Sequence, residues 1–561
     1  MFSKRKLSVD EDSESSADNE FMYLSNTESS DDSNIFCSLP KRSKELVVED
    51  DTDDDEDYVN DQLSGRWIWK DKNNEPKIWK YTETPGVKAT LFQLGKNKRE
   101  LDVFNVIFDS VFWENVVTET NRYAEQMINN KNKRRKIDEN WFPVDGDEIK
   151  VYFALCIIIA QVKKPTIKMN WSRRAVIETP IFRKTMPWKR FVQITRYLHF
   201  VNNDTTDSTD KLRKIKPLTN FFNKKFKEVY TMEEDIAIHE SLMKFKGRIT
   251  EIFNLSKSRL GIKFCKLCES ESGYCYHFKI YTDSDQINPV DSASESVVME
   301  LSQSVLDRGH TLYLDDCYSS PELFTTLLDS KTNAVGKVRP DRKNMPRDFV
   351  TSKLKKGECR LKSCNGILAL KWKNNRDVHI ISTKHETAER TEQGNLTSKP
   401  KCVIDYNKGM VGINRQARML ACFPAMRKHT KGHRKVFFYV LDMALFNSYI
   451  LFRKINAEKK QNYAEYRIEI AESLIKNVPL PEYKTRGRLS NGDLPLRLHA
   501  QHWSHFPKHI DPTPSKKRPS RACKVCTKHK KRSETTWECK TCQVALHVPE
   551  CFERYHTIED Y

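Results

Sequence analysis

Hydrophobic and polar positions along the 561-residue chain fall into two kinds of pattern. Apolar residues recur at helical spacing in residues 101–127, residues 151–162 have the composition of a buried helix, and residues 188–200 continue this character. These stretches predict an all-helical domain within residues 63–225. Helical spacing returns from about residue 409 to 475.

Short β-rich runs separate the two helical regions. Three strands, a helix, a strand and a second helix follow one another, with a further strand after them. This is the order of an RNase H-like α/β domain, although many other α/β folds share it. The predicted strands are residues 235–245, 262–268, 274–281, 311–314 and 334–338; the predicted helices are 294–306 and 321–330; a hairpin is predicted at 367–383 with its turn at 373–375.

Composition and pattern together divide the chain into seven segments. The predicted segments are an acidic, disordered leader (1–62), a helical domain (63–225), the first part of an α/β core (226–340), a β-rich insertion (341–400), the last part of the core with helices (401–476), a basic linker (477–520) and a small metal-binding domain (521–561). No apolar stretch reaches the roughly 20 residues of a membrane span, so we expect no membrane association.

Charge is divided unevenly along the chain. Residues 1–62 hold 19 acidic and 6 basic side chains, a net charge of −13, whereas the whole chain carries +19. The remaining residues therefore carry +32, which favours a polyanion such as nucleic acid as partner. Three basic clusters, at residues 4–6, 41–44 and 133–136, are candidate nuclear import signals, and the polar N-terminus is unlike a secretory signal peptide.

Cysteine spacing points to metal at the C-terminus. Five of the 15 cysteines fall within 29 residues, and two pairs have the Cys-x-x-Cys spacing that can hold one tetrahedral Zn²⁺. Seven candidate ligands are present, one short of the eight that two ions need, and His529 is the nearest candidate for the eighth. The seven are Cys523, Cys526, Cys539, Cys542, His547, Cys551 and His556.

The pairing of these ligands has two possible forms. An interleaved pairing places Cys523, Cys526, His547 and Cys551 on one ion and the remaining ligands on the other; a sequential pairing stays open. Such a short segment buries little apolar surface, so the two zinc ions are expected to supply its folding energy. Basic residues around the ligands are candidates for DNA contact: Lys516, Lys517, Arg518, Arg521, Lys530, Lys531 and Arg532.

Several ordered motifs resemble the piggyBac transposase family, and in particular the piggyBac transposable element-derived proteins. The resembling segments are ETNRY (119–123), YLHFVNN (197–203), KPL (216–218), ESLMKFKG (240–247), LCESESGY (267–274), LALKW (368–372), DYN (405–407) and FNSYILF (446–452). The C-terminal segment is similar to that family's cross-brace zinc domain. The resemblance implies an RNase H-like (DDE transposase-type) core with an inserted β-rich domain, a preceding helical domain for DNA binding and dimerisation, and a zinc domain that binds transposon-end DNA.

The same resemblance implies a two-metal site for DNA strand cleavage and transfer, built from four carboxylates. At the four family positions this chain has His239, Asp315, Asn414 and Ala417, so only Asp315 is retained. We therefore expect no catalytic Mg²⁺.

These residues favour a domesticated transposase that binds double-stranded DNA in the nucleus, as a homodimer, without strand transfer. Two alternatives stay open. One is an active transposase or nuclease with an unusual one-metal site of His239, Asp315 and Asn414. The other is a chromatin adaptor that binds protein through the zinc domain. Transposon terminal inverted repeats are the first DNA target to consider.

Overall fold

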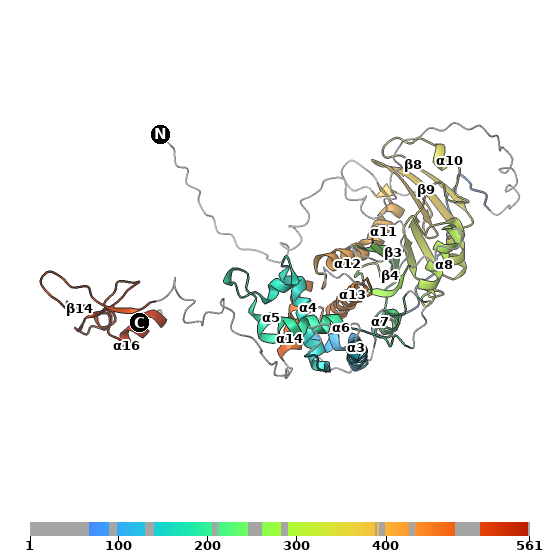
Figure 1. Ribbon diagram of the computed structural model, residues 1–561. Helices are drawn as coiled ribbons and strands as arrows, with labels where there is room; N and C mark the ends of the chain where they lie inside the picture. The colour runs from blue at the N-terminus through green and yellow to red at the C-terminus, as the bar shows by residue number, and fades with distance from the viewer. Residues whose placement is uncertain are drawn as a thin grey trace, which may run out of the picture. The chain divides into compact units, whose positions relative to one another are not determined.

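The fold is described from a computed structural model of the chain (Figure 1). The structure describes residues 67–88, 98–129, 140–204, 210, 212–244, 261–281, 290–387, 390–391, 399–425, 432–476 and 505–558. The chain divides into two compact units, Met1–Pro481 and Glu482–Tyr561. The predicted acidic leader and the three basic clusters lie outside the described residues.

Helices precede the sheet in the first unit. They are α2 (Glu100–Ile107), α3 (Ser110–Asn129), α4 (Gly146–Val162), α5 (Pro180–Thr185), α6 (Trp188–Tyr197) and α7 (Lys216–Val229), with 3₁₀ turns η5 (Ile167–Trp171) and η6 (Ala175–Ile177). The apolar faces of these helices meet in an aromatic core. For example, the ring of Phe108 lies 5.6 Å from that of Phe222, and the ring of Trp113 lies 5.4 Å from that of Phe153.

The helical spacing of residues 101–127 belongs to two helices. Helix α2 ends at Ile107 and α3 begins at Ser110. The Asp109 carboxylate accepts a hydrogen bond of 3.0 Å from the backbone N–H of Phe112 and so caps the start of α3. Apolar spacing continues on both sides of this cap, so periodicity alone did not reveal the break.

An eight-stranded mixed sheet forms the centre of the first unit, in the order β5-β4-β3-β6-β7-β10-β9-β8. Strands β3 and β6, and β6 and β7, pair in parallel; all other neighbours are antiparallel. The strands are β3 (Asp235–Lys244), β4 (Gly261–Glu269), β5 (Cys275–Ile280), β6 (Thr311–Leu314), β7 (Asn333–Lys337), β8 (Cys359–Cys364), β9 (Ile367–Lys373) and β10 (Asp377–Ser382). Strands β3 to β7, which lie in the sheet order β5-β4-β3-β6-β7, have the order and directions expected of an RNase H-like core.

The hairpin predicted at residues 367–383 is present as β9 and β10. It does not stand apart from the core, because β10 pairs with β7 and thereby continues the central sheet, with Ile381 opposite Gly336. Strand β8 adds the last strand at this edge. Strands β8, β9 and β10 of the segment predicted as an insertion therefore share one sheet with the core.

Helices cover the sheet (Figure 1). Helices α8 (Val290–Ser302) and α9 (Pro321–Asp329) pack on it, as do α11 (Lys401–Gly409) and α12 (Val411–Cys422). The smaller elements of this unit are α10 (Asp348–Thr351) and the two-stranded ribbons β1 (Gly86–Val87) with β2 (Tyr230–Thr231) and β11 (Arg390–Thr391) with β12 (Lys399–Pro400).

Two glycines allow α12 to approach the β4–β5 turn. The backbone N–H of Gly412 donates a 2.7 Å hydrogen bond to the carbonyl of Ser270. A Cβ atom at Gly273, which has φ of +80°, would lie 2.3 Å from the carbonyl oxygen of Gly412. Only glycine allows both the left-handed backbone and this contact. This contact sets the position of α12 against the edge of β4.

The last two helices return to the helical layer. Helix α14 (Tyr463–Lys476) packs on α4 and α2, and α13 (Gly432–Ile455) packs on α2 and α7. Helix α13 is long and apolar enough to cross a membrane, but 83% of its most apolar window is buried inside the protein. Its polar residues are paired there: the Asn447 side chain bonds both backbone groups of Cys275, and Asp442 pairs with the buried Arg467. The helix is therefore a core helix of this unit.

The second unit is small and contains short elements. They are β13 (Pro507–His509), β14 (Arg521–Ala522), α15 (Lys524–Lys528), β15 (Glu534–Thr535), β16 (Trp537–Cys539) and α16 (Glu550–Thr557). Strand β13 pairs with β16, and β14 with β15. Because β13 belongs to this unit, the basic linker predicted at 477–520 overlaps its folded part.

Candidate functional site

Two groups of cysteine and histidine side chains lie in the second unit. One group is Cys523, Cys526, His547 and Cys551; the other is His505, Cys539, Cys542 and His556. Within each group the four potential ligand atoms all lie within 4.8 Å of one another. Such groups of four soft sulfur and imidazole donors match the tetrahedral preference of Zn²⁺.

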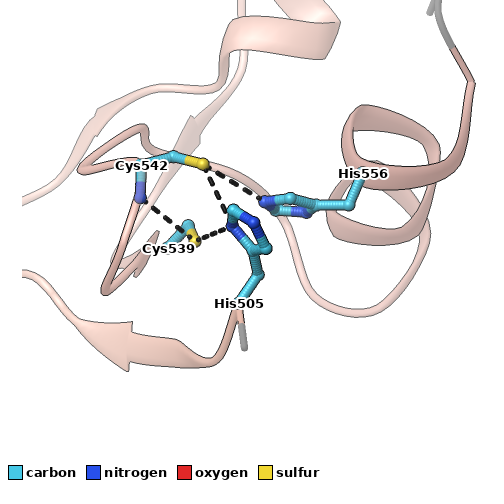
Figure 2. A group of neighbouring side chains, drawn as sticks. All are labelled: His505, Cys539, Cys542 and His556. Carbon is cyan, nitrogen blue, oxygen red and sulfur yellow. Dashed lines mark hydrogen bonds between the residues drawn. The ribbon is translucent and has the colours of Figure 1, made fainter. Parts of the chain in front are cut away.

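The second group brings its ligands from three places in the chain, as Figure 2 shows. Cys542 Sγ lies 3.1 Å from His505 Nδ1 and 3.6 Å from His556 Nε2, and His505 Nδ1 lies 3.3 Å from Cys539 Sγ. His505 comes from just before β13, whose pairing with β16 brings it to Cys539. His556 comes from α16, where its Nδ1 bonds the carbonyl of Phe552 at 2.7 Å. This second bond leaves Nε2 facing the thiols.

In the first group, too, a histidine nitrogen and cysteine sulfurs face one another. Cys526 Sγ lies 3.5 Å from His547 Nδ1 and 3.8 Å from Cys551 Sγ. His547 Nε2 lies 3.2 Å from the carbonyl of Glu534, which leaves Nδ1 as the ligand atom. Burial raises the pKa of the Cys523 thiol, but hydrogen bonds from the backbone N–H groups of Cys526 and His547 bring it down to about 7. Cys523 therefore readily adopts the thiolate form that binds metal.

The structure brings the predicted ligands together in the interleaved arrangement. It places His505 at the position for which His529 was the sequence candidate, and His529 belongs to neither group. His505 lies 34 residues before Cys539, inside a segment that sequence composition presented as a basic linker. Only the β13–β16 pairing brings it near.

Two neighbouring parallel strands in the first unit bring His239 and Asp315 together. Ile238 of β3 is in register with Leu314, the last residue of β6. His239 follows Ile238 within β3, and Asp315 follows Leu314 directly after the end of β6. His239 Nδ1 lies 3.8 Å from Asp315 Oδ2, and Tyr406 of α11 donates a 3.4 Å hydrogen bond to Asp315 Oδ1. Burial lowers the pKa of His239 despite the opposing effect of Asp315, so the imidazole is neutral at pH 7.

Asp316 lies beside Asp315, although strand alternation would have placed the two side chains on opposite faces. Strand β6 ends at Leu314, so the alternation of strand side chains does not extend to these two residues. Ligand atoms of Asp315, Asp316 and Cys317 lie within 4.8 Å of one another. Burial and the neighbouring Asp315 raise the pKa of Asp316. Among the described residues, neither His239 nor any residue of α12 belongs to this group.

Asn414 and Ala417 lie on α12, which packs against β3 and β4. Asn414 is exposed and Ala417 is partly buried. Between them, Gln416 is 1% exposed and faces the sheet. Neither predicted position on this helix offers a carboxylate.

Lys266 is a buried cation that sequence reasoning missed. It stands opposite His239 in the β3–β4 register and is 2% exposed. Its ammonium donates hydrogen bonds of 3.0 Å to Gln416 Oε1 and 2.8 Å to the Tyr439 hydroxyl. Burial lowers its pKa, but Tyr439 and the thiols of nearby cysteines raise the pKa above its ordinary value, so the ammonium stays charged. It lowers the pKa of His239 in turn. The one feature of the sequence that could have indicated this buried cation was a lysine within a predicted apolar strand.

Comparison with known proteins identifies the family. A family model described as "Transposase IS4" matches residues 99–449. PiggyBac transposable element-derived protein 2 of Homo sapiens is 23% identical over 434 residues, covering 72% of this chain and 69% of the relative. PiggyBac transposable element-derived protein 3 of Homo sapiens is 22% identical over 438 residues, covering 73% and 70%. The chain belongs to the piggyBac transposase family.

The fold agrees with this membership. The cryo-EM structure of a piggyBac transposase synaptic complex with hairpin DNA superimposes with a TM-score of 0.63 at 19% identity, covering 84% of this chain and all of the other. The motif resemblance aligns four residues of this chain with the catalytic carboxylates of the piggyBac family. They are His239, Asp315, Asn414 and Ala417. These four residues do not fit two Mg²⁺, because they offer one carboxylate, which faces the neutral imidazole of His239, and the buried ammonium of Lys266 stands opposite that histidine.

We predict that Lys266 opposes metal binding even when the family carboxylates are restored. In a chain carrying His239→Asp, Asn414→Asp and Ala417→Asp, the further change Lys266→Met is expected to tighten Mn²⁺ binding by about tenfold or more, because a buried positive charge is removed. Calorimetric titration with Mn²⁺ measures this. Lys263→Met is the matched control, since Lys263 on the same strand is half-exposed and pairs with Glu240. Equal effects of the two changes would contradict the prediction.

The seven basic residues predicted to contact DNA all lie on the surface of the second unit. Lys516, Lys517 and Arg518 precede the first cysteine pair, and Lys530, Lys531 and Arg532 follow it. Arg521 forms a 3.2 Å ion pair with Glu538. The other six belong to none of the ion pairs found in the described residues.

Proposed function

We propose that this chain is a domesticated piggyBac transposase derivative that binds double-stranded DNA in the nucleus and does not carry out strand transfer. The observation that carries the proposal is the cluster around Asp315, in which this one family carboxylate faces His239, and the buried Lys266 stands opposite His239 in the β3–β4 register. The second unit would contribute a zinc-stabilised basic surface to DNA binding. The nuclear location rests on the basic clusters of the sequence, and the homodimer on the family resemblance.

Three observations support the DNA partner. Residues 63–561 carry a net charge of +32. The exposed lysines and arginines of the second unit lie within a few residues of the first cysteine pair. The similar solved structure is a transposase complex with hairpin DNA. A positive surface of this kind binds phosphates and releases counterions, so affinity must fall with salt.

We expect the full-length chain to bind duplex DNA with an affinity that falls steeply with salt. If six to ten phosphates are contacted, affinity falls by about 10³ to 10⁵ between 50 and 200 mM salt. Fluorescence anisotropy over this range measures the slope. Replacing Lys530, Lys531 and Arg532 by Gln is expected to lower the slope by about three. Salt-insensitive binding, or none at low salt, would contradict the proposal. Terminal inverted repeats and random duplexes, compared in the same assay, test sequence preference.

A cleavage assay separates the binding protein from the alternative, an active nuclease with a one-metal site of His239, Asp315 and Asn414. The structure groups Asp315 instead with Asp316 and Cys317. Incubation with a nicked or terminal-repeat duplex in Mg²⁺ or Mn²⁺ is expected to leave the DNA intact, and Asp315→Ala is expected to leave DNA affinity unchanged. Cleavage by the wild type that Asp315→Ala abolishes would overturn the proposed function. If the chain does not bind DNA but captures chromatin proteins only when Cys539 and Cys542 are intact, the result would favour the chromatin adaptor.

A further inference from the structure

A cavity of about 370 Å³ lies among α3, α6 and α13 in the first unit. Its volume is within the range of small-molecule sites, roughly 300 to 1,000 Å³. Among the residues that the structure describes, no acidic side chain lines it, and two arginines do. The lining residues are Tyr123, Met127, Val192, Thr195, Arg196, Tyr197 and Arg434.

Arg434 is a buried cation without a counterion in the described part of the chain. It is 4% exposed, and its one hydrogen bond runs from Nη2 to the backbone carbonyl of Arg196. Its Nε atom is buried and has no acceptor there. Burial lowers the pKa of Arg434, and the charge of Arg196 lowers it further, while the neutral groups facing it are Tyr152 and Tyr123. A guanidinium held this way gains most from an anion that enters the cavity.

The other walls are apolar or already hydrogen-bonded. The Thr195 hydroxyl donates to the carbonyl of Phe191 at 2.7 Å, so it has no proton left for a ligand. The Tyr123 ring stacks on His199 with centroids 4.3 Å apart and contributes a flat aromatic wall. Met127 and Val192 add aliphatic surface. The cavity therefore pairs one positive end with an apolar body.

The sequence next to two of these walls is strongly basic. Residues 131–136, which follow Met127 closely, include five Lys or Arg, and residues 427–435, which include Arg434, hold five Lys or Arg and no acid. The segments of sequence that adjoin these two walls therefore carry an excess of positive charge.

We propose that this cavity, the Arg434 pocket, binds a phosphate group carried on an organic body, with the phosphate on Arg434 and the body against Tyr123 and Met127. Two sources have this chemistry: a nucleotide unit of bound DNA and a free nucleotide. The DNA source rests on the proposed function, whereas the free nucleotide does not.

The test uses the full-length chain with deoxythymidine monophosphate, inorganic phosphate and a random duplex as probes. The monophosphate is expected to raise the unfolding temperature of the wild type, with inorganic phosphate acting more weakly. Arg434→Met is expected to weaken the apparent affinity for the monophosphate by about tenfold or more, because a charge-assisted bidentate contact is lost. Arg453→Met is the matched control, because Arg453 is exposed on the same helix.

A second variant keeps the test decisive if Arg434→Met fails to fold. Met127→Trp fills the pocket and leaves Arg434 in place, so it is expected to abolish the response to the monophosphate. With duplex DNA, a nucleotide unit in the pocket predicts that Arg434→Met lowers the salt slope by about one; an unchanged slope assigns the pocket to the free nucleotide. A wild type that does not respond to the monophosphate, or a folded variant that responds equally, overturns the proposal. Monophosphate binding without DNA binding would leave the pocket standing and remove the proposed function.

Discussion

Replacing Cys539 by Ser is expected to lower the zinc content from about two ions per chain to one or fewer and to unfold the second unit. The reason is that its apolar core is small, with Cys523, Cys539, Val525 and Leu546 as its buried members. Structural zinc contributes about 10 to 16 kcal/mol to comparable folds, far more than such a core supplies. Elemental analysis of the purified chain measures zinc, and amide hydrogen exchange over residues 505–558 measures folding.

Two histidines provide the matched comparison. His505→Ala is expected to behave like Cys539→Ser, because the His505 imidazole faces both thiols of the second group. His529→Ala is expected to keep two ions and full protection, because His529 is exposed and outside both groups. Zinc loss in His529→Ala with retention in His505→Ala would show that the ligand assignment is wrong.

The second large effect is expected in the helical layer, where Glu148→Gln should destabilise the first unit by about 3 to 5 kcal/mol. Arg190 and Glu148 are 3% and 1% exposed, and the two carboxylate oxygens accept hydrogen bonds of 2.7 and 2.5 Å from the guanidinium. Loss of the carboxylate leaves a buried positive charge between α4 and α6. Urea denaturation followed by tryptophan fluorescence measures the change.

Glu228→Gln is the control for this change. Glu228 lies on α7, is exposed, and pairs with Lys224 across 3.7 Å at the surface. Exposed pairs of this kind contribute about 0 to 1 kcal/mol. Equal destabilisation by Glu148→Gln and Glu228→Gln would mean that the buried ion pair contributes no more to the free energy of unfolding than the exposed pair does.

Local patterns in the sequence were enough to find seven of the eight residues of the two cysteine–histidine groups and most elements of the core. The Cys-x-x-Cys pairs predict a zinc site, because a short turn lets two thiolates at that spacing bind the same ion. Short β-rich apolar runs predicted β3, β4, β6, β9 and β10 close to their observed bounds, because strands buried in a central sheet are rich in apolar side chains. Motif resemblance then placed the chain in its family and located the missing carboxylates.

Contacts between distant segments were decided only by the tertiary structure. His505 becomes a ligand through pairing of β13 with β16, across 34 residues. Strand β10 joins the central sheet through β7, which the pattern of a free-standing hairpin cannot show. Lys266 and Arg434 look like ordinary basic residues in sequence, and their burial follows from helices packed over them. The spacing of apolar residues along the chain indicates which face of a helix or strand is buried. Which element packs against that face depends on the whole fold.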